Sequence, residues 1–286
     1  YGVTNIGGSS GSGTIFEFDP VTNIYVKKYD FIGTNNGVEP LGLIRTANGL
    51  FYGLTVGGGA NSYGTIFEYD PINNIYQKKL DLDNVNTGSN PHQNLISALD
   101  GKLYGLTSMG GSNNKGVLFE FDPITNIFTK HIDFDGLTNG STPQGQLVQA
   151  SSGRIYGTTY KGGLNDMGTV FEFDPINKVF RKTLDFAGVN GKYPYGGLIE
   201  VKKRALPVGN NLLYPNPFST TAVLETGTLN SGQLVIYDVL GQEVKNFSIQ
   251  GNRTYISSEG LPSGLYVYKI GNGNDHKISG KFIIIH

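Results

Sequence analysis

A phrase of thirteen residues recurs four times along the chain and limits what the chain can fold into. Its first copy reads GTIFEFDPVTNIY, and the other three differ from it at only a few positions. The copies begin at Gly13, Gly64, Gly116 and Gly168. A Tyr-Gly pair precedes each copy, at Tyr1, Tyr52, Tyr104 and Tyr156. These pairs are 51, 52 and 52 residues apart, and a fixed period of about 50 residues is typical of a repeat architecture.

Each unit reads as four short strands, with no helical periodicity. In one unit the strands are expected at 92–98, 102–108, 116–122 and 127–134. Turns rich in Gly, Asn, Asp and Pro separate them, which indicates an antiparallel meander. The third strand is apolar on both faces, because Phe16 and Phe18 point away from Ile15. We therefore expect an all-β fold, a β-propeller of four-stranded antiparallel blades stacked face to face.

The fourth strand carries charge in every unit. Its charged residues are Lys27, Lys78, Lys130 and Lys182, with Asp30, Asp81, Asp133 and Asp185. Charges on an outer edge strand protect it from pairing with other chains, so this strand is predicted to lie at the outer edge.

The register of the units allows two interpretations of how the propeller closes. The chain starts at the second strand of a blade and has one extra first strand at 195–201. That strand can complete the first blade by pairing Leu198–Val201 with Tyr1–Thr4, closing a ring of four. Alternatively, the chain is part of a larger propeller. The absence of an initial Met and of a signal peptide favours a fragment or processed form, and hence the larger propeller.

From Leu212 the repeat gives way to a different pattern. Alternating strands with Gly and Pro turns over about 75 residues predict a small Ig-like β-sandwich. We therefore divide the chain into repeats at 1–203, a linker at 204–211 and a second domain at 212–286.

The second domain resembles the type A C-terminal sorting domain of the type IX secretion system of Bacteroidota. The matching residues are Tyr214, Pro215, Asn216, Pro217 and Phe218, Ile236, Tyr237 and Asp238, Leu240 and Gly241, Leu261, Gly264, Leu265 and Tyr266, and Lys277, Gly280, Lys281 and Phe282. The resemblance implies contact with that secretion machinery, export across the outer membrane and removal of the domain by a sortase-like peptidase. It also implies, in many members, anchoring of the mature protein to lipopolysaccharide.

The repeats at 1–203 resemble the GloVer type, with GG and GTIFEFDP as the core of each unit. They are also similar to kelch blades, which place Gly-Gly after the second strand. The Trp of kelch blades is replaced here by Tyr25, Tyr76, Phe128 and Phe180. The resemblance supports the architecture better than any particular activity.

Composition removes several classes of function. The formal net charge is −1 and charged residues make up 16%, so no basic face for nucleic acid is expected. No apolar run of about 18 residues is present, so no transmembrane helix is expected. With no Cys, the chain has neither disulfides nor thiol catalysis.

The acids of the repeated phrase are tempting catalytic candidates. Those in its third strand are Glu17, Glu68, Glu120 and Glu172. Because an enzyme needs such a residue once, recurrence indicates a hydrogen-bonding partner between strands. The Asp before each Pro is predicted to bond the backbone of its turn.

The GGSSG at 7–11 fits the serine-hydrolase elbow only by chance, because it lies in a hairpin loop. No catalytic residue is assigned.

Calcium is the one metal with any support. Asp81 and Asp83, and likewise Asp133 and Asp135, group oxygen ligands as calcium loops do. Neither loop has the full EF-hand spacing, so ordinary solvated loops are the preferred interpretation, and no cofactor is expected.

Two sets of long loops leave each blade on the same face and differ between blades. They are Gly7–Gly13, Gly57–Gly64, Gly110–Gly116 and Gly162–Gly168, with Gly33–Pro40, Asn84–Pro91, Gly136–Pro143 and Gly188–Pro194. Variable loops on a fixed scaffold often carry recognition. The candidate ligand-binding residues are Ser9, Asn61, Asn113, Asn165, Tyr160 and Tyr193.

The expected role is therefore a secreted or cell-surface module that binds an extracellular ligand, a glycan or a protein. One alternative is an extracellular enzyme, for example one that degrades polysaccharides or peptides, whose catalytic part lies upstream. The other is a structural component of the cell surface.

Overall fold

The computed structural model describes residues 1–201, 212–225, 231–272 and 275–286. The chain forms two compact units, Tyr1–Glu200 and Val201–His286. Within the described ranges every regular element is a β-strand, and none of them contains a helix able to cross a membrane. The linker expected at 204–211 lies outside the described residues.

The first unit consists of four antiparallel sheets, here called repeat sheets 1 to 4, one for each copy of the phrase. Sheet 1 contains β1 (Gly2–Thr4), β2 (Thr14–Asp19) and β3 (Ile24–Asp30). Sheet 2 contains β4 (Val38–Pro40), β5 (Ile44–Arg45), β6 (Phe51–Gly57), β7 (Thr65–Asp70) and β8 (Ile75–Asp81). Sheet 3 contains β9 (Ile96–Ser97), β10 (Leu103–Thr107), β11 (Val117–Asp122) and β12 (Ile127–Asp133). Sheet 4 contains β13 (Val148–Gln149), β14 (Ile155–Thr159), β15 (Thr169–Asp174) and β16 (Val179–Asp185).

Neighbouring sheets bury one another's faces. Each sheet has an aromatic face, which in sheet 4 carries Phe171, Phe173 and Phe180, and an opposite face that we call the aliphatic face. In sheet 3 the aliphatic face carries Tyr104, Leu106 and Leu118. The aromatic face of sheet 4 packs on the aliphatic face of sheet 3 in one core cluster. Similar clusters join sheets 2 and 3 and sheets 1 and 2, so the expected apolar third strand with two covered faces is confirmed.

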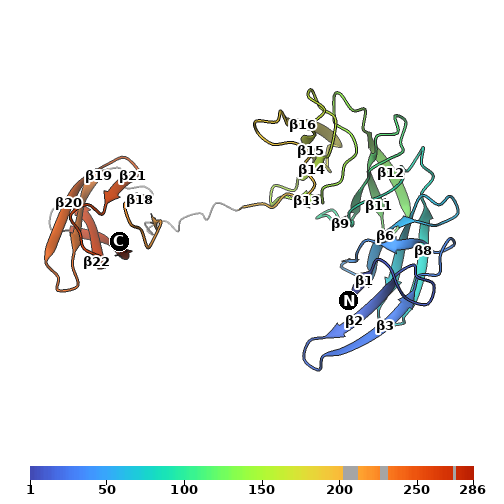
Figure 1. Ribbon diagram of the computed structural model, residues 1–286, viewed down its shortest axis with the longest axis horizontal. Coiled ribbons are helices and arrows are strands. Elements are labelled where there is room, and N and C mark those ends of the chain that lie inside the picture. The colour runs from blue at the N-terminus through green and yellow to red at the C-terminus, as the bar shows by residue number, and fades with distance from the viewer. Residues whose placement is uncertain (202–211, 226–230, 273–274) are drawn as a thin grey trace. The chain divides into compact units, whose positions relative to one another are not determined.

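The four sheets follow an open arc, with sheets 1 and 4 at its two ends (Figure 1). Among the described residues β1 pairs only with β2, and 195–201 form no strand. The pairing of Leu198–Val201 with Tyr1–Thr4 that would close a ring of four is therefore not found.

The segment at 195–201 lies instead against sheet 4. Ser151 donates to Glu200 from its backbone nitrogen, at 2.9 Å, and from its hydroxyl, at 2.6 Å. One repeat earlier, the backbone nitrogen of Leu99 donates to the side chain of Gln149 at 2.8 Å. The segment thus takes, against sheet 4, the position that the first strand of sheet 4 takes against sheet 3.

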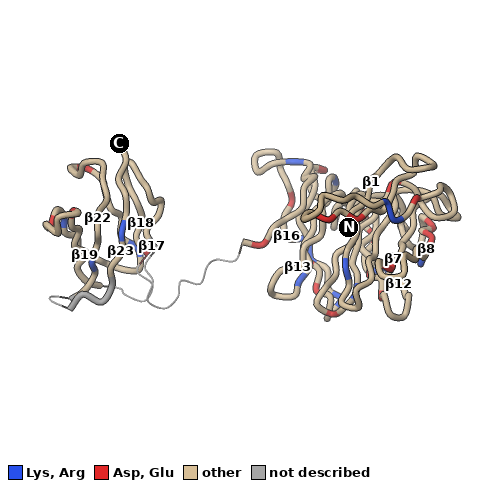
Figure 2. Tube along the Cα trace, turned by 90° about the horizontal axis from the view of Figure 1, so that it is seen from below, with Lys and Arg blue, Asp and Glu red and all other residues tan. Residues whose placement is uncertain are grey.

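The charged fourth strands β3, β8, β12 and β16 lie at the sheet edges, as predicted. Lys and Arg are interspersed with Asp and Glu over the first unit (Figure 2).

The second unit is a sandwich of two antiparallel sheets. One contains β17 (Leu212–Tyr214), β18 (Thr221–Glu225) and β21 (Arg253–Ser257). The other runs in the order β20 (Glu243–Gln250), β19 (Ser231–Tyr237), β22 (Gly264–Asn272) and β23 (Asp275–Ile284). One apolar cluster joins them, with Leu224, Ile256 and Phe282 fully buried at its centre.

Candidate ligand-binding site

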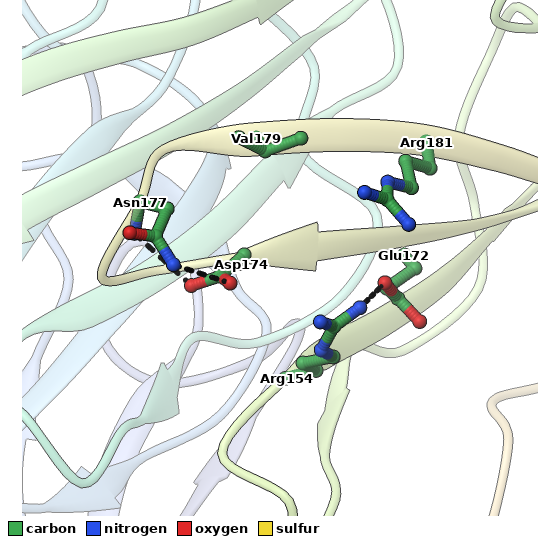
Figure 3. A pocket seen from close by; sticks show the side chains of 6 residues that line it. All are labelled: Arg154, Glu172, Asp174, Asn177, Val179 and Arg181. Atoms are coloured by element: carbon green, nitrogen blue, oxygen red, sulfur yellow. Dashed lines mark hydrogen bonds and ion pairs between the residues drawn. The ribbon is translucent and has the colours of Figure 1, made fainter.

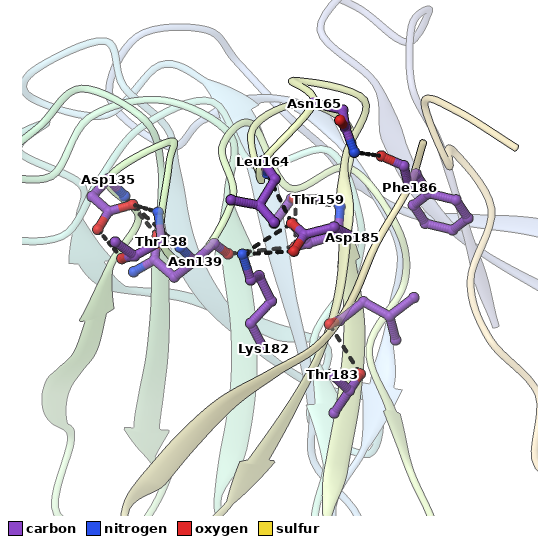
Figure 4. A network of polar contacts seen from close by, with 12 residues as sticks. Asp135, Thr138, Asn139, Thr159, Leu164, Asn165, Lys182, Thr183, Asp185 and Phe186 are labelled. Carbon is purple, nitrogen blue, oxygen red and sulfur yellow. Dashed lines mark hydrogen bonds and ion pairs between the residues drawn. The ribbon is translucent and has the colours of Figure 1, made fainter. Parts of the chain in front are cut away.

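The loop after the second strand of each repeat is fixed by the last residue of the edge strand. In sheet 4 the carboxylate of Asp185 accepts from the backbone nitrogen of Leu164 at 3.0 Å and pairs with Lys182 at 2.9 Å (Figure 4). The same two contacts recur in all four repeats, through Asp30, Asp81, Asp133 and Asp185. We call this arrangement the loop clamp.

The loop asparagines predicted to bind ligand hold the same loops in place. The side-chain amides of Asn61, Asn113 and Asn165 donate to backbone carbonyls at 3.0, 3.2 and 3.0 Å. The backbone nitrogen of Ser9 donates to Asp30 at 3.0 Å. These four residues brace their own loops and are not brought together, so their role in binding stays a prediction.

The carboxylates considered for calcium are engaged by neighbouring donors. Asp83 accepts from Asn86 and Thr87, and Asp135 accepts from Thr138 and Asn139. Burial would raise the pKa of Asp83, but these hydrogen bonds outweigh it and lower the pKa. In the parts of the chain that the structure describes, no three acidic or His side chains form a metal-binding group. The expectation of ordinary solvated loops without a cofactor, with calcium as the less favoured interpretation, stays a prediction.

Three tyrosines gather at the loop end of sheet 4. The rings of Tyr160 and Tyr193 stack with centroids 5.2 Å apart, and Tyr195 meets Tyr160 edge-on at 6.3 Å. The Lys192 ammonium lies 5.5 Å from the Tyr193 ring centroid. Tyr193 is 39% exposed and Tyr195 58% exposed. The two tyrosines predicted from the sequence are therefore adjacent, and they form an exposed aromatic surface with a cation beside it.

The repeat fixes the backbone beneath these tyrosines while leaving their side chains free to differ. Tyr193 has a left-handed φ of 55° and donates its backbone N–H to the carbonyl of Met167 at 2.8 Å. Its equivalents share that φ region and that hydrogen bond, and they are Glu39, Asn90 and Thr142. A bulky residue with positive φ is uncommon, and strained backbone is often found at functional sites.

The tyrosine cluster occurs in sheet 4 alone. The positions equivalent to Tyr160 hold Asn5, Val56 and Ser108, and those equivalent to Tyr195 hold Leu41, His92 and Gln144. Sequence reasoning missed Tyr195 because it reads as part of a first strand. The signal was the Tyr-Pro-Tyr at 193–195, which places two aromatic residues around a fixed turn.

The recurrent glutamates lie on the aliphatic face of each sheet, and all four are paired. Glu17 pairs with Lys28 at 2.7 Å and Glu68 with Lys79 at 3.5 Å, while Glu172 pairs with Arg154. A Tyr of the neighbouring strand also donates to the last three glutamates, from Tyr52, Tyr104 and Tyr156. The expectation that they are hydrogen-bonding partners between strands is confirmed.

A β-bulge explains how a basic side chain of the fourth strand reaches the glutamate in the first three repeats. The register between the third and fourth strands shifts by one residue in every repeat, for example between Leu118 and Phe119. The extra residue is turned onto the glutamate side of the sheet, as bulges commonly redirect a side chain. It is Lys28, Lys79 or His131 in the first three repeats.

Glu120 is the most enclosed of the four. Its carboxylate meets Lys102, His131 at 2.9 Å and Lys178 at 2.6 Å. Burial alone would raise the pKa of Glu120, but hydrogen bonds from these groups and from Tyr104 lower it to about 2. Lys178 comes from a turn of sheet 4, so this site bridges two sheets.

The equivalent place in sheet 4 is a cavity of about 190 Å³ lined by Arg154, Glu172, Asp174, Asn177, Val179 and Arg181. Figure 3 shows the Arg181 side chain extending from β16 toward Glu172, which Arg154 meets from the other side. In sheet 3 the corresponding space receives Lys178.

The residues of the sorting motif lie on the second unit. Asn216 donates to the carbonyl of Lys281 at 3.3 Å and accepts from the Ile283 nitrogen at 2.9 Å. Tyr266 is buried and donates to the Pro262 carbonyl at 2.8 Å. The remaining motif positions are turn, exposed or strand-start residues, namely Tyr214, Pro215, Pro217, Gly241 and Gly264.

The chain is similar to solved structures at low sequence identity. The extracellular domain of a putative one-component system from B. thetaiotaomicron has a TM-score of 0.50 at 14% identity, over 99% of this chain and 41% of that chain. PorZ, an essential surface component of the type IX secretion system of Porphyromonas gingivalis, has a TM-score of 0.43 at 11% identity, over 98% of this chain and 51% of that chain. The chain thus spans about half or less of these structures. No curated protein matches it.

Two family models match the chain and together account for nearly all of it. The "Secretion system C-terminal sorting domain" matches residues 212–285. This domain directs export by the type IX secretion system, so the protein is secreted or displayed at the cell surface. The "Gloeobacter/Verrucomicrobia repeat" matches residues 1–211. The chain therefore belongs to the Gloeobacter/Verrucomicrobia repeat family.

Proposed function

We propose that the repeat sheets are the blades of a β-propeller that acts as an extracellular binding module, with a glycan as its ligand. The observation that carries this proposal is the cluster of Tyr160, Tyr193 and Tyr195. It lies at variable positions of a repeated framework, outside the cell, and Tyr195 is 58% exposed where the other repeats have Leu41, His92 and Gln144.

The chemistry of the cluster suits a sugar ring. The apolar C–H face of a pyranose packs on an aromatic ring, and the hydroxyl groups around it need donors and acceptors. The phenol groups of Tyr193 and Tyr195 provide both, and Lys192 adds a cation at the edge. A uronic acid, with its carboxylate, fits this cation better than a neutral sugar does.

Binding to a printed panel of neutral and uronic-acid oligosaccharides tests the proposal. Tyr193→Ala and Tyr195→Ala should each weaken binding about two- to tenfold, since an aromatic contact contributes roughly 0.5–1.5 kcal/mol. Tyr63→Ala is the matched control, because Tyr63 is an exposed loop tyrosine of sheet 2 outside the cluster. Equal binding by the Tyr195→Ala variant would refute the site, and a response only to proteins would favour a protein ligand.

We propose binding rather than catalysis because the recurrent carboxylates serve the fold. Glu120 is held by two lysines, a histidine and a tyrosine, and the loop aspartates are held by lysines and backbone nitrogens. An extracellular enzyme remains the alternative, and hydrolysis of any bound oligosaccharide by the purified chain would favour it.

We also propose that a sortase-like peptidase removes the sorting domain after export. Deleting Lys277–His286 removes most of β23, including the buried Phe282 and Ile284. The truncated protein should accumulate in the periplasm with its repeat unit folded, as protease resistance of residues 1–200 would report. Conversely, residues 204–286 fused to an unrelated exported protein should carry it to the surface. Normal surface display of the truncated form would show that the tail is not the export signal, and full-length protein at the surface that keeps its tail would contradict removal by a peptidase.

A further inference from the structure

A short segment between β17 and β18 lies along the outer edge of β23. This strand is the outermost of its sheet. The backbone of Phe218 donates to the carbonyl of Ile283 at 3.1 Å and accepts from the nitrogen of Ile285 at 3.0 Å. The segment thereby adds a short parallel partner to the end of β23. We call this contact, between 216–218 and 281–285, the clasp.

Asn216 closes the clasp with its side chain. Its amide donates to the carbonyl of Lys281 at 3.3 Å, and its oxygen accepts from the backbone nitrogen of Ile283 at 2.9 Å. One side chain thus supplies the donor and the acceptor that a neighbouring strand would supply at a sheet edge. Asn216 is exposed, so these bonds replace bonds to water and each adds only modest stability.

Apolar packing beneath the clasp holds the same two segments independently. Phe218 is 3% exposed, and its ring centroid lies 5.5 Å from that of Phe282. Phe282 and Ile284 are fully buried in the core cluster of the sandwich. We therefore expect the domain to fold without the Asn216 amide, whose own contribution is to fix how the outer surfaces of the two segments lie.

Two exposed apolar patches flank the clasp. Tyr214 and Tyr255, on the two strands beside β18, are in register and are 38% and 66% exposed. Leu265 and Ile283 pair across β22 and β23 and are 42% and 41% exposed. Asn216 links the patches, since it follows Tyr214 by two residues and bonds Ile283. Exposed aromatic and aliphatic residues gathered in this way are typical of a surface that binds another protein.

This surface exists only in the folded domain. Asn216 and Ile283 are 67 residues apart in the chain, near opposite ends of the matched sorting domain. A single segment has the same sequence whether or not the domain is folded. The clasp, in contrast, forms only after the later segment has been synthesised and packed, because a domain folds as a unit.

We propose that a protein subunit of the type IX export machinery binds the surface that the clasp assembles, through an apolar groove, and so selects sorting domains whose two ends have met. The proposal rests on the export role of this domain. Lys281 is exposed beside Asn216 and favours an acidic rim on that groove.

Surface display of the full chain, expressed behind a signal peptide in a host with a type IX system, tests the proposal. Asn216→Ala should lower display about tenfold, because the binding surface is no longer preorganised. Lys245→Met is the matched control, since its ammonium also makes two bonds to backbone carbonyls, of Ser257 and Glu259, from the opposite edge of the sheet. The two variants should lower the melting temperature of the second unit similarly, and only Asn216→Ala should lose display. Normal display of Asn216→Ala, or an equal loss with Lys245→Met, would overturn the proposal.

A disulfide in place of the amide separates the shape of the clasp from the chemistry of Asn216. Ser219 and Ile285 are exposed and each lie one residue beyond the paired Phe218 and Ile284. Because paired strands lie within disulfide range, Ser219→Cys with Ile285→Cys should cross-link in the oxidising periplasm. Added to Asn216→Ala, this pair should restore display. Display that stays low although the disulfide has formed would overturn the proposal.

Tyr255→Ser tests the apolar patch with the clasp intact, because Tyr255 makes none of the clasp bonds. Display should fall, and normal display would overturn the proposal. A native chain that forms dimers, with Tyr255→Ser remaining monomeric by light scattering, would assign the surface to a second copy and overturn it as well.

The deletion of Lys277–His286 is the reference for export itself. If the truncated form is displayed, the export role of the domain fails. If the truncated form is retained and Asn216→Ala is displayed normally, the export role stands and the clasp is refuted.

Discussion

Repeat sheets 3 and 4 hold the same glutamate in different surroundings. The Glu120 side chain is 5% exposed and is bonded by Lys102, His131 and Tyr104 of its own sheet and by Lys178 of the next. The Glu172 side chain is 14% exposed and is bonded by Arg154 and Tyr156 of its own sheet alone. The difference indicates that each sheet supplies most of the partners of its own glutamate, and that the next sheet adds one further cation and covers the site.

Exclusion of solvent also decides how much each ion pair contributes to the free energy of unfolding. A partly exposed pair such as Glu172 with Arg154 is weakened by solvent. At Glu120, removal of the glutamate itself would leave several basic groups unpaired in a place with little water, which is strongly destabilising. The same residue type at the same position is therefore expected to have unequal effects.

The largest difference in stability is expected between substitutions of Glu120 and of Glu172. Glu120→Gln should lower the free energy of unfolding by about 3 kcal/mol, because it leaves Lys178 and Lys102 beside a neutral amide. Glu172→Gln should lower it by about 1 kcal/mol or less. Urea unfolding followed by circular dichroism compares them. Equal losses would show that enclosure by the next sheet does not matter, and loss of glycan binding with Glu120→Gln would contradict its structural role.

The second effect isolates the contact between the sheets. Lys178→Met removes the ammonium that reaches Glu120 from sheet 4, and should cost about 1 kcal/mol because the lysine is partly exposed. Lys182→Met removes the local pair with Asp185 and serves as the control, with an expected cost of about 0.5 kcal/mol. A smaller loss for Lys178→Met than for its control would show that the contact from sheet 4 does not stabilise the site at Glu120.

Acid should act on sheet 3 in two stages. Burial lowers the pKa of His131, and Lys178 and Lys102 lower it further, against the opposing effect of Glu120. The unfolded chain then binds a proton near pH 6.5 that the folded chain does not, so stability falls as pH drops through 6.5. The pKa of Glu120 is depressed to about 2, so its contribution is full above its ordinary 4.5 and is lost toward pH 2.

Sheets 1 and 2 have Lys at the position of His131. His131→Lys should therefore remove the part of the stability loss near pH 6.5 that comes from His131, and leave the loss toward pH 2 that comes from Glu120. Burial lowers the pKa of His92 as well, so the comparison is made in a His92→Gln background. The melting temperature between pH 7.5 and 5.5 is the measurement. An unchanged pH slope in the His131→Lys chain would mean that His131 does not titrate in this range.

The smallest effect should come from the open cavity. Arg181→Thr introduces the residue that sheet 3 has at that position, Thr129. Because Arg181 is exposed, stability should change by no more than about 0.5 kcal/mol. A large loss would show that Arg181 is a main partner of Glu172.

The sheets, their edges and the glutamate pairing could be predicted because each follows from a short-range pattern. Alternation along TIFEFD placed Phe16 and Glu17 on opposite faces, and the charge on the fourth strand indicated an edge. Recurrence then distinguished a structural role from a catalytic one, since every unit has a glutamate at the position of Glu120.

Residue type alone could not identify the partners of the site residues. Asn113 resembles a ligand-binding side chain, yet it bonds the carbonyl of Phe134, 21 residues later in the chain. Lys178 reads as one more turn residue, and its contact with Glu120, 58 residues away, depends on how two sheets pack. The tyrosine cluster likewise depends on two loops meeting at one end of a sheet.

The loop clamp has a consequence for how such a protein changes over generations. Each aspartate holds the backbone nitrogen of its loop, a contact that any side chain allows, and the residue there is Ser9, Ala60, Ser112 or Leu164, of which Ser112 also donates its hydroxyl to Asp133. A substitution at that position therefore alters the surface without loosening the loop. The information for folding is kept in the strands and the aspartates, so lineages can diversify what the loop face recognises while inheriting one scaffold, and an engineer can randomise the same positions.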